Sequence, residues 1–179
     1  MERCRMVFSG SGGQGVITAA IILAEAAVLH ENLTAVQTQS YGAAARGGAT
    51  RSDVIISDTV INFPKVIQPN VLVCLTQEAY NKFYDIIRPG GLLITDPRFV
   101  TPQLKVDAIQ HELPMYEMVM KKIGKPIVFN ICMLGAVVGF TELVKPESIM
   151  KVLRMRIPPG FLKMNHQALE LGLTLGGKG

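Results

Sequence analysis

The sequence predicts an α/β protein of the doubly wound class: a single three-layer domain with a mostly parallel sheet and helices on both faces. Apolar runs of strand length alternate along the chain with longer runs of helical period. Residues 71–75 are apolar throughout, which is typical of a central parallel strand. A glycine-rich turn joins the first strand-like run directly to the first helix-like run. We expect residues 1–175 to form this domain and residues 176–179 to be a flexible tail.

Strands are expected where short runs of β-forming residues lie between turn signals. Residues 4–9 form the first run and residues 33–38 the second, and Ser57-Asp58 indicates a turn between two further short strands. Asp96-Pro97 closes a later strand. In chain order, the expected strands are 4–9, 33–38, 51–57, 59–63, 71–75, 92–95 and 105–110.

Helices are expected where apolar residues recur every three or four positions. The first, residues 15–30, is apolar almost all round and should therefore be buried. Later helices are bounded by Pro89-Gly90-Gly91 and by Gly124-Lys125-Pro126. The small residues Gly135, Ala136 and Gly139 should allow a neighbouring segment to approach closely. The expected helices are 15–30, 78–87, 116–123, 130–140, 146–155 and 161–173.

The composition argues against a membrane-spanning protein and gives no sign of a nucleic-acid-binding one. Hydrophobic residues make up 49% of the chain and charged residues 18%, against about 25% charged in a typical soluble domain. No apolar run reaches the roughly 18 residues of a membrane helix, so we expect the excess apolar surface to meet a partner subunit. Lys and Arg are scattered through a chain of net charge +4, which gives no support to nucleic-acid binding.

Three cysteines stand far apart, at Cys4, Cys74 and Cys132, with no C-x-x-C pair. This spacing argues against a disulfide framework and against a zinc or iron–sulfur site in this chain. The first residues lack the apolar stretch and cleavage site of a signal peptide. We therefore expect a cytoplasmic protein with reduced, buried thiols.

The first glycine-rich turn, Gly10-Ser11-Gly12-Gly13-Gln14-Gly15, lies between a strand and a helix. Helix N-termini and glycines suit the approach of an anionic group. A dinucleotide-binding site would need an acidic residue at the end of the second strand to bind the ribose, but this strand ends in Gln37-Thr38-Gln39. A P-loop would need a lysine directly after the last glycine to contact the phosphates, but Val16-Ile17 stands there. The glycines could also serve only a tight turn and close helix–sheet packing.

A second unusual segment, Ser40-Tyr41-Gly42-Ala43-Ala44-Ala45-Arg46-Gly47-Gly48, follows the second strand. We expect the two loops to lie at the carboxyl ends of neighbouring strands, where open α/β folds build their sites. Arg46 could hold a phosphate or carboxylate through two parallel hydrogen bonds, or it could pair with a carboxylate across a subunit interface.

The sequence offers no catalytic set. His30, His111 and His166 fall in different elements, without a cysteine or carboxylate at ligand spacing. Asp53 and Asp58 are expected to be solvated strand ends rather than an acid–base pair.

Taken together, the two loops resemble those of the gamma subunit of the 2-oxoacid:ferredoxin (acceptor) oxidoreductases. The resemblance runs through nearly the whole chain, and residues 36–42 and 63–69 are most similar to the 2-oxoglutarate branch. The residues that carry it are 10–15, Gln39-Ser40-Tyr41-Gly42, Arg46-Gly47-Gly48, Ser52, Ile56-Ser57 and Asn130 with Met133-Leu134-Gly135. Members of that family usually carry Pro-Glu where this chain has Ala43-Ala44, so any contact made by that glutamate is missing here.

The resemblance implies a subunit of a hetero-oligomer that decarboxylates 2-oxoglutarate oxidatively, with coenzyme A, to succinyl-CoA and carbon dioxide. It implies alpha, beta and ferredoxin-like delta partners that carry thiamine diphosphate, magnesium and iron–sulfur clusters, with no cofactor in this chain. A gamma subunit for pyruvate, branched-chain or indolepyruvate chemistry, a stand-alone nucleotide-binding protein and a purely structural module are the alternatives. Both glycine-rich loops are expected to face the assembled active site or the path of coenzyme A.

Overall fold

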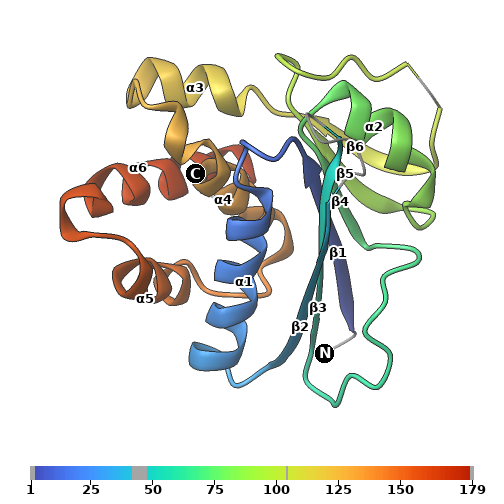
Figure 1. Cartoon of the computed structure of the whole chain (residues 1–179), viewed down its shortest axis with the longest axis horizontal. Helices are drawn as coiled ribbons and strands as arrows, with labels where there is room; N and C mark the ends of the chain where they lie inside the picture. Colours follow the sequence, from blue (N-terminus) through green and yellow to red (C-terminus); the bar gives the residue numbers. More distant parts are fainter. Residues whose placement is uncertain (1–2, 42–47, 104, 178–179) are drawn as a thin grey trace.

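A six-stranded sheet divides the protein into two helical layers of unequal size (Figure 1). The structure is a computed structural model that describes residues 3–41, 48–103 and 105–177. The strand order is β2-β3-β1-β4-β5-β6. The strands are β1 (Cys4–Gly10), β2 (Thr34–Ser40), β3 (Thr50–Ser57), β4 (Val71–Cys74), β5 (Gly91–Thr95) and β6 (Ala108–Glu112).

The sheet is mostly parallel, as predicted, with β3 inserted against the common direction. Strand β1 pairs in parallel with β4, β4 with β5, and β5 with β6. Strand β3 is antiparallel to both β1 and β2, so β2 runs in the same direction as β1. The prediction that β1 and β2 are neighbours is therefore wrong, because β3 returns along β2 and lies between them. The strand predicted at residues 59–63 is also absent, since those residues belong to the β3–β4 connection.

Helices cover the two faces unevenly, and Figure 1 shows most of them on one side of the sheet. The larger layer and the sheet share one apolar core, and α2 covers the other face over a second core. No helix in the described ranges is long and apolar enough to cross a membrane. The helices are α1 (Val16–His30), α2 (Gln77–Phe83), α3 (Met115–Lys122), α4 (Phe129–Thr141), α5 (Pro146–Arg156) and α6 (Leu162–Leu175).

Helix α1 is buried along most of its length because its apolar residues meet neighbours on nearly every side. It contacts β1, β2 and β3 on one side and α4 and α5 on the other. At its C-terminal end, the carboxylate of Glu31 accepts hydrogen bonds from the Lys145 backbone N–H (2.9 Å) and the Ser148 hydroxyl (2.6 Å). These bonds hold the pKa of Glu31 below its usual value and fix the start of α5 against α1.

Helices α4 and α6 touch backbone to backbone through glycines. A Cβ built on Gly172 would lie 2.8 Å from the Ala136 nitrogen, and one on Gly139 would lie 3.0 Å from the Leu173 carbonyl oxygen. The expected close approach at Gly135, Ala136 and Gly139 is confirmed, and the neighbour is α6. Gly176, the first residue of the predicted tail, lies against Gly139, whereas residues 178–179 lie outside the described residues.

We expect Gly172→Ala to lower the free energy of unfolding by about 2–3 kcal/mol, because the added methyl group meets backbone atoms that cannot move aside. The matched control is Gly160→Ala, where a Cβ would have no neighbour within 4 Å. Chemical denaturation of the two variants and the parent chain measures the difference. Equal midpoints for both variants would contradict the close contact.

Candidate functional site

The first glycine-rich loop connects β1 to α1 and is held in place by one side chain. The Ser11 backbone N–H donates a hydrogen bond to Gln14 Oε1 (2.9 Å), and Gln14 Nε2 donates to the Leu75 carbonyl oxygen (2.9 Å). Leu75 directly follows β4, so Gln14 ties the loop to the carboxyl end of the neighbouring parallel strand. The sequence placed Gln14 in the loop, but its bond to a residue 61 positions away had no sequence signal.

The four glycines of this loop fall into two pairs. Gly10 and Gly15 lie in close contact with the fold. A Cβ on Gly10 would displace Gln14 Oε1 and lie 3.2 Å from Leu75 Cβ, and Gly15 has a φ of +72° with Asn130 in close contact. Gly12 and Gly13 are exposed, and a Cβ on Gly13 would have no neighbour within 4 Å. Nothing in the described structure requires a glycine at these two positions, so they leave the loop surface open to a group from outside.

Helix α1 starts at this loop without a side-chain cap. Gly15 takes the N-cap position, and the first turn of the helix carries no acidic residue. The first backbone N–H groups of a helix have no partner within it and carry a partial positive charge. This end of the loop therefore favours anions.

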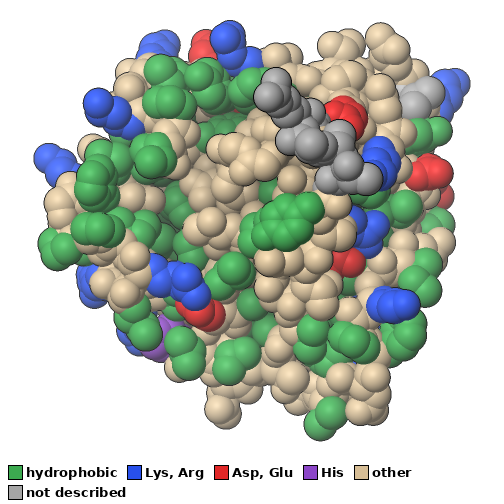
Figure 2. All heavy atoms as spheres, viewed as in Figure 1, with side chains coloured by type: hydrophobic (Ala, Val, Ile, Leu, Met, Phe, Trp, Pro, Cys, Tyr) green, Lys and Arg blue, Asp and Glu red, His purple; other side chains and the backbone are tan. Residues whose placement is uncertain are grey.

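A groove of about 880 Å³ opens beside the loop, between α1 and the neighbouring helices α3, α4 and α6. Figure 2 shows hydrophobic side chains gathered over this helical half of the molecule. The groove is polar at the loop and largely apolar elsewhere. Its lining includes Ser11, Gly13, Gln14, Gly15, Thr18, Ile22, Phe99, Tyr116, Ile127, Phe129, Asn130, Arg156, Ile157, Phe161, Met164 and Asn165.

Two asparagines in the groove are almost fully buried. Asn130 is 8% exposed and Asn165 is 6% exposed. Their amide nitrogens donate to backbone oxygens, Asn130 to Gly15 (3.2 Å) and Asn165 to Phe161 (2.8 Å). Neither side-chain oxygen makes a hydrogen bond within the part of the chain that the structure describes. The groove therefore combines donors from the loop with acceptors from α4 and α6.

The second loop begins at the same edge of the sheet but opens on the other face. Ser40 ends β2 and is exposed, and Tyr41 is 68% exposed, with its hydroxyl accepting from Gln39 Nε2 (3.1 Å). Both border a hollow of about 620 Å³ beside Phe83, which belongs to the core under α2. Gly48 is half-buried. Gly42, Arg46 and Gly47 lie outside the described residues, so their role stays a prediction.

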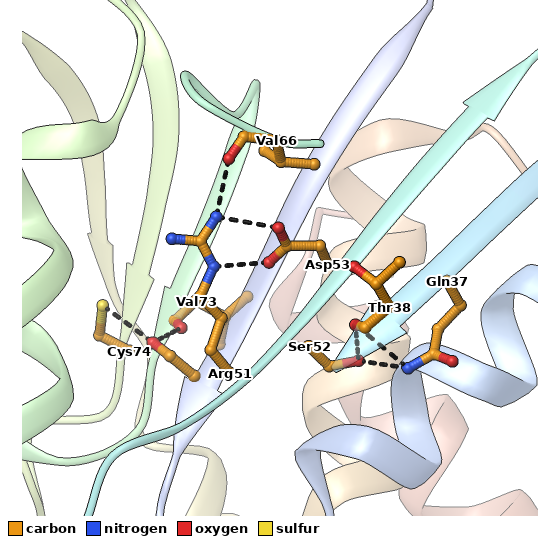
Figure 3. Close-up of polar contacts among 9 residues, drawn as sticks. Gln37, Thr38, Arg51, Ser52, Asp53, Val66, Val73 and Cys74 are labelled. Carbon is orange, nitrogen blue, oxygen red and sulfur yellow. Dashed lines mark hydrogen bonds and ion pairs between the residues drawn. The ribbon is translucent and has the colours of Figure 1, made fainter. Parts of the chain in front are cut away.

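Strand β3 carries a cation, Arg51, that is held by an ion pair and a hydrogen bond (Figure 3). Arg51 forms an ion pair with Asp53, with 2.6 Å between Nε and Oδ1, and its Nη2 donates to the Val66 carbonyl oxygen at 2.8 Å. The Asp53 side chain is only 14% exposed, so the expectation of a solvated strand end is wrong for Asp53. On the other face, Gln37 Nε2 donates to the Ser52 hydroxyl (2.8 Å).

Buried titratable groups lie deeper in the fold. Burial raises the pKa of the Cys74 and Cys132 thiols to about 12, so both stay protonated at neutral pH. Asp96 is fully buried after β5, and its oxygens accept from the backbone N–H groups of Arg98 (2.9 Å) and Tyr116 (2.8 Å). Burial raises the pKa of Asp96 more than these bonds lower it. Its bond to Tyr116 fixes the start of α3, which makes Asp96 a structural residue.

Possible metal ligands do not gather in the described part of this chain. Within residues 3–41, 48–103 and 105–177, no group of three or more His, Cys, Asp or Glu residues could hold a metal ion. His30, His111 and His166 remain apart: His111 lies against the Phe140 ring with 4.5 Å between centroids, and His166 lies 3.4 Å from Glu170 on α6.

Comparison with known proteins identifies the family. The chain matches the pyruvate ferredoxin/flavodoxin oxidoreductase family over residues 5–175. It is 46% identical to the 2-oxoglutarate synthase subunit KorC of Methanocaldococcus jannaschii, over 92% of this chain and 89% of that one. It is 31% identical to the ketoisovalerate oxidoreductase subunit VorA of Methanothermobacter thermautotrophicus, over 94% of this chain and 35% of that one.

A crystal structure of the keto/oxoacid ferredoxin oxidoreductase gamma subunit from Geobacter sulfurreducens PCA has the same fold. Its TM-score is 0.89 at 37% identity, over 98% of this chain and 97% of that one. The chain therefore belongs to the pyruvate ferredoxin/flavodoxin oxidoreductase family.

The division of the loop glycines predicts that substitution by alanine has unequal effects on stability at Gly15 and at Gly13. We expect Gly15→Ala to lower the free energy of unfolding by about 2 kcal/mol, from the left-handed backbone and the contact with Asn130. Gly13→Ala should change it by less than about 0.5 kcal/mol, because its surroundings are open. Denaturant titration measures both. A Gly13 variant as unstable as the Gly15 variant would show that the fold also requires glycine at position 13.

Proposed function

We propose that this member of the pyruvate ferredoxin/flavodoxin oxidoreductase family is the gamma subunit of a 2-oxoglutarate-oxidising complex. The complex would convert 2-oxoglutarate and coenzyme A to succinyl-CoA and carbon dioxide and pass two electrons to ferredoxin or another acceptor. The observation that carries the proposal is the 46% identity to a 2-oxoglutarate synthase subunit over nearly the full length of both chains. The ketoisovalerate relative is 31% identical, which favours the 2-oxoglutarate branch.

Within such a complex, this chain would be a non-catalytic domain. Iron–sulfur clusters are held by several cysteine thiolates together, and Cys74 and Cys132 are buried in separate cores on opposite faces of the sheet. These cysteines do not fit a cluster. We therefore propose that thiamine diphosphate, magnesium and the clusters are carried by alpha, beta and ferredoxin-like delta partners. A reducing cytosol would keep the three thiols of this chain reduced.

The contribution of this chain would be the open surface of its first loop. Gly12 and Gly13 let another group reach the backbone, and the uncapped start of α1 favours a negative charge there. The substrates of the proposed reaction are anionic, since 2-oxoglutarate has two carboxylates and coenzyme A has phosphates. We propose that the first loop faces one of them in the assembled complex, and that Arg46 of the second loop contributes a further cation.

Substrate choice is tested on the assembled complex. The tagged chain is purified gently from its native cells, and the eluate is assayed for CoA-dependent dye reduction with 2-oxoglutarate, pyruvate, 2-oxoisovalerate and indolepyruvate. We expect partner chains to co-purify and 2-oxoglutarate to give the highest kcat/KM. Highest activity with another oxoacid would overturn the substrate assignment. A chain that purifies alone and binds a nucleotide in calorimetry would overturn the subunit assignment.

The role of the first loop is tested in the same complex with Gly13→Ala and Gly13→Leu. The larger side chain should raise the KM of coenzyme A or of 2-oxoglutarate about tenfold or more, a loss of about 1.4 kcal/mol in binding. The smaller side chain should have a lesser effect. Which KM rises identifies the anion at the loop. If both variants assemble with the kinetics of the parent complex, the loop faces neither substrate.

A further inference from the structure

The connection between β3 and β4 is unusual for its length. Residues 58–70 contain no helix or strand, and in Figure 1 they form the long loop at the lower right. The loop can do without a helix because β3 ends and β4 starts at the same edge of the sheet, on either side of β1. Connections longer than about 12–15 residues without secondary structure are uncommon in compact domains and are usually functional when ordered, and this loop lies at that threshold.

This loop is held in a defined shape. Val66 is buried, and its carbonyl oxygen accepts from Arg51 Nη2 (2.8 Å). The carbonyl oxygen of Val60 accepts from Arg3 Nη2 (3.0 Å). Two prolines further restrict the backbone. A surface that is ordered before it binds loses less conformational entropy on association.

Despite this anchoring, the loop directs large apolar side chains into solvent. Val60 is 71% exposed, Phe63 is 54% exposed and Ile67 is 69% exposed. Single exposed apolar residues are ordinary, but several on one loop are typical of an interaction site.

Positive charge accompanies these apolar side chains. Arg5 from β1, Lys65 from the loop and Arg88 from the turn before β5 border a hollow of about 610 Å³ with Phe63 and Ile67. The other residues of its lining are Gln68 and Pro89, so none of them is a carboxylate. Lys65 is exposed, and no ion pair involving its side chain is formed among the described residues.

We propose that this surface, formed by residues 58–70 with Arg5 and Arg88, docks an acidic segment of a partner subunit. The segment would place an apolar side chain between Phe63 and Ile67 and set Asp or Glu side chains against the three cations. Such complementarity selects the partner and speeds its association. The inference rests on the proposed function, because it takes the partner from the same complex. The part of the surface at Arg5 and Arg88 lies at the sheet edge opposite the first glycine-rich loop, whereas Lys65 and Ile67 also border the hollow beside Ser40 and Tyr41.

Zero-length cross-linking of the purified complex tests the contact. A carbodiimide joins a lysine amine to a carboxylate that touches it, and mass spectrometry should find Lys65 linked to an Asp or Glu of a partner chain. Lys65→Arg should keep the assembly and lose the cross-link, because the charge remains and the amine is gone. Lys65→Glu should weaken assembly about tenfold or more in low salt, since it sets like charges against each other.

Two further variants separate a specific contact from general effects. Phe63→Ser should weaken assembly similarly with little dependence on salt, whereas Lys163→Glu, on the exposed side of α6, should leave assembly unchanged. Circular dichroism and thermal unfolding establish that each variant is folded. Parent-like assembly of both Lys65→Glu and Phe63→Ser, or a Lys65 cross-link only to a second copy of this chain, would overturn the docking proposal. Oxoacid-dependent activity of the parent complex would then still support the proposed function, whereas a parent chain that purifies alone would overturn both.

Discussion

Burial of α1 on nearly every side is the constraint on which the rest of the structure depends. The helix lies between the sheet and the pair α4 and α5, and its sequence has almost no polar face to turn toward water. Its axis is therefore fixed by packing, and its first residue must follow a sharp turn from β1. Gly15 supplies the left-handed backbone of that turn. Gln14 ties the turn to Leu75 at the end of β4, and Asn130 of α4 donates to the Gly15 carbonyl oxygen. The geometry of the first loop follows from the packing of the helix behind it.

The protein presents different chemistry at the two edges of its sheet. At the carboxyl edge, the loop after β1 offers backbone donors and open glycines beside a partly apolar groove. At the amino edge, the β3–β4 loop offers cations and exposed apolar side chains. The reversal of β3 produces this second surface, because it brings the end of β3 and the start of β4 to one edge. A subunit with two such edges suits a position between two other components of an assembly.

Local sequence patterns predicted which segments form helices and strands better than they predicted which strands pair with one another. The apolar run at 71–75 and the helical spacing of Tyr116, Val119 and Ile123 each marked an element that the structure contains. The insertion of β3 was not predictable in this way, since the identity of a strand's neighbours depends on contacts far apart in sequence. The same holds for Asp53, whose partner Arg51 is two residues away but whose burial depends on the tertiary fold around β3.

For the same reason, the sequence predicted only part of the candidate site. Glycines between a strand and a helix indicate a loop from sequence alone, but they do not show which glycines the fold requires. The structure separates Gly10 and Gly15 from Gly12 and Gly13 through neighbours contributed by Gln14 and Asn130. The acceptor oxygens of Asn130 and Asn165 also became visible only when α4 and α6 were placed beside the loop. Side chains that act through distant partners leave no local pattern.

Because the ribosome makes the chain from its N-terminus, α1 is synthesised long before the helices that bury it. The helix is complete by His30, but the residues that cover it lie far ahead: Asn130 is 115 positions from Gly15, and Lys145 is 114 from Glu31. At about 5–20 residues per second, the helix waits on the order of ten seconds on the ribosome before α4 and α5 can cover its other side. A nascent or truncated chain that lacks α4 and α5 therefore displays this helix to chaperones and to other chains.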